Sequence, residues 1–272
     1  MTEIPCIRWY EAAQKRRSRR SFNSSPIASD LLAKIDKVCK EFKPFHGIRA
    51  VVVSRSVDKV FKGIVGHYGK IRGATVFIAF IGDMNDPYIH EKAGYTGEGI
   101  ILEATALNLG TCWVGASFNP AVASSSVQLR KNEKVLAVTP VGYAVEKVSF
   151  EEKIMTGFGR THKRKSLFEL VKGLEESKWP EWIKTALEAA RIAPSAVNRQ
   201  PWRFNIEPGS ITISVDDLKD TYNIPKRLDC GIAMLHIEIA ALYRGIRGKW
   251  EFLSPPQVAR FVAQIPSDSA FA

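Results

Sequence analysis

Ala-Pro-Ser-Ala-Val-Asn-Arg-Gln-Pro-Trp-Arg-Phe, residues 193–204, is the stretch that decides the fold. It follows a helical pattern and leads into an extended pattern at residues 202–206. Its polar side chains, Ser195, Asn198 and Gln200, are costly to bury unless other groups hydrogen-bond them. A planar heterocycle with several donors and acceptors would do so. A turn in which Ser195 and Asn198 cap the neighbouring backbone is the alternative.

Length and composition indicate an ordinary globular protein. The chain has 272 residues, of which 45% are hydrophobic and 25% charged, the usual proportions of such proteins. No run of about eighteen apolar residues occurs, so the sequence predicts no membrane association, and residues 1–20 show no secretory signal. The four cysteines are scattered, which argues against zinc and against a disulfide framework and predicts a reducing cytoplasm. They are Cys6, Cys39, Cys112 and Cys230.

The net charge of +11 needs an explanation. Part of the excess is clustered at residues 15–20 and 160–165. Such clusters bind nucleic acid, a cofactor phosphate or an anionic surface, or are simply solvated. No helix-turn-helix pattern, zinc finger or basic strand with interleaved aromatics accompanies them. We therefore expect no nucleic-acid partner, with a basic nucleic-acid-binding protein kept as an alternative.

The chain contains an internal echo. Residues 94–113 and 231–250 align without a gap, from a glycine at the start of each stretch to a tryptophan at its end. Both stretches read as helices that are apolar on nearly every face, so we expect both in the core. Gly110 and Gly245 stand where a left-handed C-terminal cap is expected.

Shorter elements surround each long helix. The pattern predicts helices at 31–38 and 182–191, a loop at 117–126, and strands at 48–54, 75–81, 135–141, 202–206 and 211–215. This alternation predicts an α+β fold, a three-layer α-β-α sandwich built from two pseudo-symmetric halves. The halves, 1–160 and 161–272, are expected to intertwine into one compact unit. Two independent domains joined by a linker are the alternative.

Four motifs together resemble the FMN-dependent nitroreductase superfamily. They are the Lys-Arg-Arg-Ser-Arg-Arg-Ser-Phe run at 15–22, the stretch 189–204, Leu-Gly-Thr-Cys-Trp-Val-Gly at 109–115 and Thr-Pro-Val-Gly-Tyr at 139–143. The resemblance implies a nitroreductase-like sandwich. Residues 41–47, which should match 194–200, lack the Ser and the Asn. The chain thus resembles a duplicated branch in which one chain supplies both sides of an intersubunit-type site, with one good and one degenerate flavin site.

The resemblance also implies which residues bind FMN. Arginine forks suit its phosphate, and Gly115 with Ala116 would approach the ring near N5. The phosphate ligands would be Arg16, Arg17, Ser18 and Arg20, with Arg160, Arg164 and Lys165 completing the anion cage. Pro194, Ser195 and Ala196 would lie along the ring, with Asn198 and Gln200 near its polar edges. We expect no metal site and assign no catalytic residue. His236 and Cys112 are expected in the core, and His46, His67 and His90 in loops.

The implied reaction has two steps. NADH or NADPH delivers hydride to FMN, and a small organic acceptor then takes the electrons. The family implies a nitroaromatic, a quinone or an activated alkene as the acceptor. The absence of a Rossmann fingerprint agrees with transient binding of the nicotinamide. The alternatives are an FMN-binding sensor or storage module without turnover and a specialised flavin enzyme, and both a monomer and a homodimer stay open.

Overall fold

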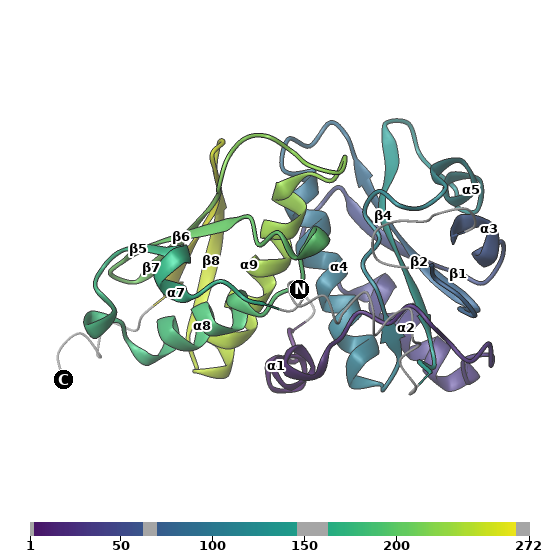
Figure 1. The fold of residues 1–272 in the computed structure, drawn as a ribbon, viewed down its shortest axis with the longest axis horizontal. Helices are drawn as coiled ribbons and strands as arrows, with labels where there is room; N and C mark the ends of the chain where they lie inside the picture. The colour runs from purple at the N-terminus through teal and green to yellow at the C-terminus, as the bar shows by residue number, and fades with distance from the viewer. Residues whose placement is uncertain (1–2, 62–69, 146–162, 265–272) are drawn as a thin grey trace.

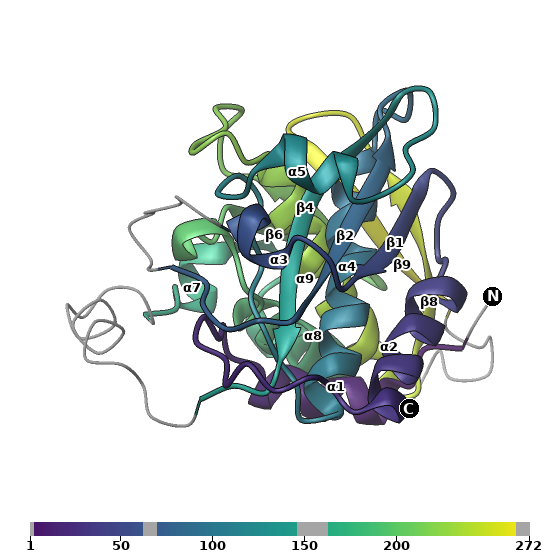
Figure 2. The ribbon, with the colours of Figure 1, turned by 90° about the vertical axis from the view of Figure 1, so that its right-hand side faces the viewer.

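A computed structural model describes residues 3–61, 70–145 and 163–264. It consists of two β-sheets with a layer of helices between them (Figure 1). Two short helices cover the outer face of the first sheet (Figure 2). The α+β class is therefore confirmed. The layers are, in order, the outer helices, the first sheet, the central helices and the second sheet. The first three layers are the predicted α-β-α sandwich, and the second sheet covers the other side of the central helices.

The first sheet is antiparallel, with strand order β1-β2-β4-β3. Its strands are β1 (Ile48–Val53), β2 (Val76–Asp83), β3 (Gly110–Thr111) and β4 (Glu133–Gly142). Helices α2 (Ser29–Glu41) and α4 (Ile89–Ala106) pack on one face, and α3 (Val57–Phe61) and α5 (Pro120–Ser125) on the other. Since both faces are covered, seven of the eight β2 residues are buried, which explains the strand's continuous apolar run.

Helix α5 corrects one expectation from the sequence, because residues 117–126 were expected to form a loop. Asn119 begins the helix, and its Oδ1 accepts a hydrogen bond from the Val122 N–H at 3.2 Å. Pro120 occupies the first helical position, where its missing N–H costs nothing. The polar composition that suggested a loop is the N-terminal signature of a short helix.

The second sheet has strand order β5-β6-β7-β9-β8. Its strands are β5 (Val171–Gly173), β6 (Trp202–Glu207), β7 (Ser210–Val215), β8 (Arg247–Phe252) and β9 (Gln257–Gln264). Strand β5 is parallel to β6, and the other pairs are antiparallel. Burial alternates along β6, because one face of this sheet meets the helices. The hairpin β8–β9 is absent from the predicted elements.

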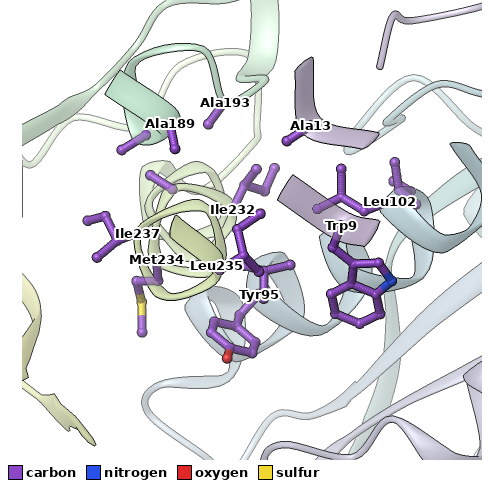
Figure 3. Packing of buried hydrophobic residues seen from close by; sticks show 14 of the residues in the cluster. Trp9, Ala13, Tyr95, Leu102, Ala189, Ala193, Ile232, Met234, Leu235 and Ile237 are labelled. Carbon is purple, nitrogen blue, oxygen red and sulfur yellow. The ribbon is translucent and has the colours of Figure 1, made fainter. Parts of the chain in front are cut away.

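The other helical elements are α1 (Cys6–Lys15), α7 (Leu167–Leu170), α8 (Glu181–Arg191), α9 (Lys226–Tyr243) and the short 3₁₀ turns η1 (Glu176–Lys178) and η2 (Ala196–Asn198). The two central helices are α4 and α9, and the other elements of the helical layer include α1 and α8. Helix α1 packs on both α4 and α9, and α8 packs on α9. Their apolar side chains form one core that includes Trp9, Tyr95 and Leu235 (Figure 3). Among the described residues, no helix has the length and apolar character needed to cross a membrane.

Helices α4 and α9 cross through a reciprocal backbone contact. A Cβ on Gly94 would lie 2.0 Å from the carbonyl oxygen of Leu228, and a Cβ on Gly231 would lie 2.0 Å from that of Glu91. In each helix, the carbonyl oxygen of the residue three positions before the glycine therefore contacts the glycine of the other helix. Only glycine permits this approach on either side.

The left-handed caps differ in part from the prediction. Gly245 has φ +77°, as predicted. Gly110 does not have a positive φ, so the prediction for it was wrong. The left-handed residue after α4 is instead Asn108, with φ 60°. Gly110 pairs with Gly142 in the first sheet. Asn108 lies fourteen residues after Gly94, as Gly245 does after Gly231, so the two caps occupy corresponding places in the echo.

Candidate functional site

The loop 193–200 between α8 and β6 holds a costly backbone conformation. Val197, Asn198 and Gln200 have φ of 50°, 55° and 48°. A β-branched residue is rare in this left-handed region, and each such residue costs about 1–3 kcal/mol. The surrounding structure must therefore fix the loop, and such strain often marks a functional site.

Asp229, in the first turn of α9, is the main anchor of this loop. Its Oδ1 accepts a hydrogen bond from Ala196 N at 3.1 Å, and its Oδ2 accepts one from Arg199 Nε at 2.7 Å. Arg199 also donates to the carbonyl of Ile224 at 2.9 Å. Asp229 is 1% exposed, and burial raises its pKa to about 6 although Arg199 opposes the shift. The ion pair ties the strained loop to the start of α9.

The polar side chains of the motif are satisfied by the protein itself. Asn198 Oδ1 accepts from Arg164 Nη1 at 2.9 Å, and Gln200 Oε1 accepts from the Lys165 N–H at 2.8 Å. Both side-chain amides donate to the Lys163 carbonyl at 3.0 Å. Ser195 Oγ accepts from the Gln200 N–H at 3.0 Å. These contacts agree with the turn alternative, with residues 163–165 as the partner of the loop.

A cluster of arginines lies beside this loop. Arg164 donates to the carbonyl oxygens of Ile192 and Ala193. Burial, followed by the positive charges of Arg16, Arg191 and Arg17, lowers its pKa to about 10. The sequence motif at the end of α1 therefore lies within electrostatic range of Arg164, which binds the loop 193–200. Arg191 pairs with Glu188, and Arg16 lies 3.7 Å from Glu98. Two carboxylates do not balance the four arginines, so the group attracts an anion.

The two other predicted cations face different partners. Lys165 Nζ turns to the loop and donates to the carbonyls of Arg199 and Gln200 at 3.2 and 3.1 Å. The carbonyl of Arg20 accepts from the Arg72 N–H at 2.9 Å. Arg160 lies outside the described residues.

Ser18 lies next to strand β3. It pairs with Thr111 in a parallel bridge, and the following Arg19 N–H donates to the Thr111 carbonyl at 2.7 Å. Thr111 is 1% exposed, and its side-chain hydroxyl has no hydrogen-bond partner among the described residues. The Arg-Arg-Ser motif is thus fixed to the first sheet beside an unsatisfied polar atom.

Gly115 and Ala116 follow Val114, which bridges to Val138. Gly115 is half-buried, and a Cβ added to it would lie 3.1 Å from Ile224. Ala116 is exposed. Because Arg199 binds the Ile224 carbonyl, Gly115 borders the segment that the strained loop holds in place. Gly115 is thus linked to the strained loop through Ile224 and Arg199.

Sequence reasoning missed the buried groups behind these motifs. Glu98 on α4 is fully buried and accepts from Trp113 Nε1 at 2.6 Å, and His236 Nε2 lies 3.0 Å from its other oxygen. His236 is confirmed as a satisfied core histidine, since its Nδ1 bonds the Ala189 carbonyl at 2.9 Å. The available signal was a glutamate inside the otherwise uncharged stretch 93–102 of the helix. Asp229 and Arg199 were also missed.

Three smaller expectations concern histidine, cysteine and metal. His90 was expected in a loop but lies in the first turn of α4, where burial lowers its pKa. Cys112 is buried, as predicted. Within the described residues, no group of three or more His, Cys, Asp or Glu side chains is arranged to hold a metal ion.

Comparison with known proteins identifies the family. The chain matches the family model described as "Putative TM nitroreductase" over residues 8–241. A solved "putative nitroreductase" from Thermotoga maritima is 19% identical, with 93% of each chain covered and a TM-score of 0.63. No curated protein matches the chain.

Two other solved structures align with about half to two thirds of the chain. A nitroreductase family protein from Clostridium novyi is 21% identical, with 51% of this chain and 86% of that chain covered and a TM-score of 0.43. A nitroreductase with bound FMN from Bacteroides fragilis is 16% identical, with 63% and 97% covered and a TM-score of 0.42. On the strength of the family model, which spans most of its length, the chain belongs to the nitroreductase family so described.

Proposed function

We propose that this protein is an FMN-dependent oxidoreductase. It takes hydride from NADH or NADPH and reduces a small organic acceptor, such as a nitroaromatic, a quinone or an activated alkene, at one flavin site per chain. The observation that carries the proposal is the meeting of the Arg-Arg-Ser motif with Arg164 and the strained loop 193–200. Family membership supports the same reaction class.

The residues at this meeting point fit a phosphate dianion. Arg164 lies in the field of three other arginines. Arg16 is 7% exposed, and its one ion pair among the described residues, to Glu98, spans 3.7 Å. Thr111 adds an unsatisfied hydroxyl. Guanidinium groups and hydroxyls are the donors that bind phosphate, so Arg16, Arg17 and Ser18 would hold the phosphate of FMN, with Arg20, Arg164 and Lys165 around it.

The isoalloxazine ring would lie between the loop and Gly115. Pro194, Ser195 and Ala196 would line one side, while Gly115 and Ala116 present backbone without a bulky side chain. Asn198 and Gln200 would act at the polar edge and, through their bonds to residues 163–165, keep the loop rigid. FMN, when bound, supplies the hydride-accepting and electron-donating chemistry. The protein binds the ring, orients it and leaves one face open to donor and acceptor in turn.

We further propose that residues 1–160 and 161–272 form a fused pseudo-dimer. The reciprocal contact of Gly94 and Gly231 supports this arrangement, because a two-fold interface brings the same surface of each half together. The Arg-Arg-Ser motif then comes from one half and the Pro-Ser motif from the other. One chain alone supplies both sides of the site.

The absorption spectrum of the purified protein tests the proposal, with FMN counted per chain after release by heat. We expect about one FMN per polypeptide and bleaching of the flavin band by NADH or NADPH. Bound flavin that neither donor reduces would favour a sensor or storage module. No bound flavin, with no binding of added FMN, would overturn the proposal.

A further inference from the structure

A fully buried carboxylate lies directly behind Arg16. Glu98 has no exposed surface, and both of its oxygens are engaged. Its Oε2 accepts from Trp113 Nε1 at 2.6 Å, and its Oε1 lies 3.0 Å from His236 Nε2. The same Oε1 lies 3.7 Å from Arg16 Nε. Because a buried polar group without its partner is destabilising, Trp113 and His236 fix Glu98 in one position.

This network connects the two sides of the proposed site. It runs from the Ala189 carbonyl on α8 to His236 on α9, then to Glu98 on α4 and Arg16 at the end of α1. Helix α8 leads directly into the loop 193–200. The buried chain of contacts therefore sets the distance between the Arg-Arg-Ser motif and that loop.

Among the described residues, the contact of the Arg16 guanidinium with an acidic group is the one to Glu98. At 3.7 Å the contact with Glu98 is a coulombic attraction, longer than a hydrogen bond. Burial lowers the pKa of Arg16, and Glu98 opposes that shift. Glu98 thus holds the guanidinium in place by its charge without occupying the N–H groups that an anion would bind.

We propose that Glu98, fixed by Trp113 and His236, is the positioning residue for Arg16 and thereby determines the preference for a phosphorylated flavin. This inference rests on the proposed function. FMN and riboflavin differ only in the phosphate, so a residue that acts through Arg16 changes their relative affinity. A residue that only stabilises the fold weakens both ligands alike.

The test measures the dissociation constants of FMN and riboflavin by flavin fluorescence in the wild type and in Glu98→Asp. This substitution keeps the charge and moves the carboxylate by one methylene. We expect the FMN affinity to fall roughly tenfold, the loss of about one charge-assisted hydrogen bond, with riboflavin affinity unchanged. An equal loss for both ligands, or no loss for FMN, would overturn the inference.

Glu238→Asp is the matched control. Glu238 lies on the other central helix and accepts from Tyr95 at 2.6 Å and from Trp250 at 2.7 Å. The structure gives it no arginine partner among the described residues. The same shortening there should leave the ratio of the two affinities unchanged.

Two further measurements keep the inference testable. The double variant Arg16→Gln with Glu98→Asp should lose no more FMN affinity than Arg16→Gln alone, since residues acting through one contact are not additive. If Glu98→Asp does not fold, Trp113→Phe removes one donor to Glu98, and an unchanged affinity ratio in that variant refutes the inference. A wild type that binds neither flavin refutes the proposed function itself. A wild type that binds FMN, together with an unchanged affinity ratio in the variants, refutes only the role of Glu98.

Discussion

Two regions of the molecule, here called the Gly115 corner and the Phe252 corner, occupy corresponding places in the echo. One lacks a side chain, and the other is filled by an aromatic ring. Gly115 lies two residues after Trp113, and Phe252 lies two residues after Trp250. Gly115 leaves backbone facing Ile224. Phe252 fills its corner with a ring that stacks on Tyr88, with centroids 5.3 Å apart. We therefore expect the proposed site to depend as much on the missing side chain at Gly115 as on the polar groups around it.

The helices beside the two corners differ in the same sense. Asp229 and Lys92 each lie two residues before a crossing glycine. Asp229 binds Arg199 at 2.7 Å and holds the strained loop. Lys92 binds Asp86 at 2.6 Å and lies 5.0 Å from the centroid of the Phe252 ring. At the Gly115 corner the charge of Asp229 fixes a polar loop. At the Phe252 corner the charge of Lys92 lies over an aromatic ring.

The loops that face the corners complete the contrast. Residues 41–47 place Phe42 in the core and pack Phe45 edge-on against Phe252, with centroids 5.2 Å apart. The loop 193–200 instead has three residues with positive φ and a network of polar contacts. Aromatic packing leaves no polar edge for a cofactor, so we expect one flavin per chain.

The largest effect is expected from Asp229→Ala. It leaves the partly buried Arg199 without its carboxylate and releases the strained loop. The free energy of unfolding should therefore fall by about 3–5 kcal/mol, and flavin binding should be lost. Urea denaturation measures the first effect. Lys92→Ala, the corresponding change at the other corner, should cost about 1 kcal/mol. Equal losses for both variants would contradict the asymmetry of the corners.

Alanine at Gly94 or Gly231 tests what the two halves share. Each added methyl would meet a backbone carbonyl at 2.0 Å, and such overpacking should cost about 3 kcal/mol. We expect the two losses, measured by thermal or urea unfolding, to be alike. Gly245→Ala is the control, because nothing lies within 4 Å of its Cβ position. It should lose only about 1 kcal/mol through its positive φ. Unlike losses at Gly94 and Gly231 would weaken the pseudo-dimer.

The ionisation of Asp229 gives an effect of intermediate size. Burial raises its pKa to about 6 in the folded protein, above about 3.9 in the unfolded chain. The folded state therefore binds the proton more tightly, and stability from this group increases as the pH falls from 7 to about 4.5. The unfolding free energy of the wild type, relative to Asp229→Asn, should rise by about 2 kcal/mol over that range. A constant difference would show that Asp229 keeps an ordinary pKa.

The smallest effect on stability is expected when a ring is placed in the open corner. Gly115→Phe should cost about 1 kcal/mol, because Gly115 is half-buried and Ile224 must shift. Its FMN affinity should nevertheless fall at least tenfold, measured by fluorescence titration. Phe252→Ala should do the reverse, with a larger loss of stability and an unchanged affinity. FMN binding that survives Gly115→Phe would place the flavin elsewhere.

Much of the fold was predictable from periodicity. The central helices are apolar on nearly every face because sheets, other helices and each other surround them, and β2 is a continuous apolar run for the same reason. Strand β8 was missed because Arg247, Lys249 and Glu251 interrupt it on an exposed face. The cap at Asn108 was missed because Gly110, two residues later, is the more common left-handed residue.

The site was predictable only where it is contiguous in sequence. The loop 193–200 and the Arg-Arg-Ser run carry their signals locally, and the nitroreductase family that they indicated is confirmed. The partners of these motifs are set by packing. Glu98 and His236 meet across 138 residues, and Arg199 and Asp229 across 30 residues. No local pattern specifies such pairs, because the crossing of α4 and α9 brings the first pair together and the packing of α8 on α9 brings the second.

That crossing also has an evolutionary consequence. Since Gly94 faces a carbonyl of α9 and Gly231 faces a carbonyl of α4, a change in either helix alters the surface that the other must fit. The two helices are therefore expected to covary under selection. Phe252 and Gly115 have separate neighbours, so each corner is free to mutate on its own. A shared and constrained centre with independently variable corners allows a protein of this design to acquire a new ligand at one end without rebuilding its core.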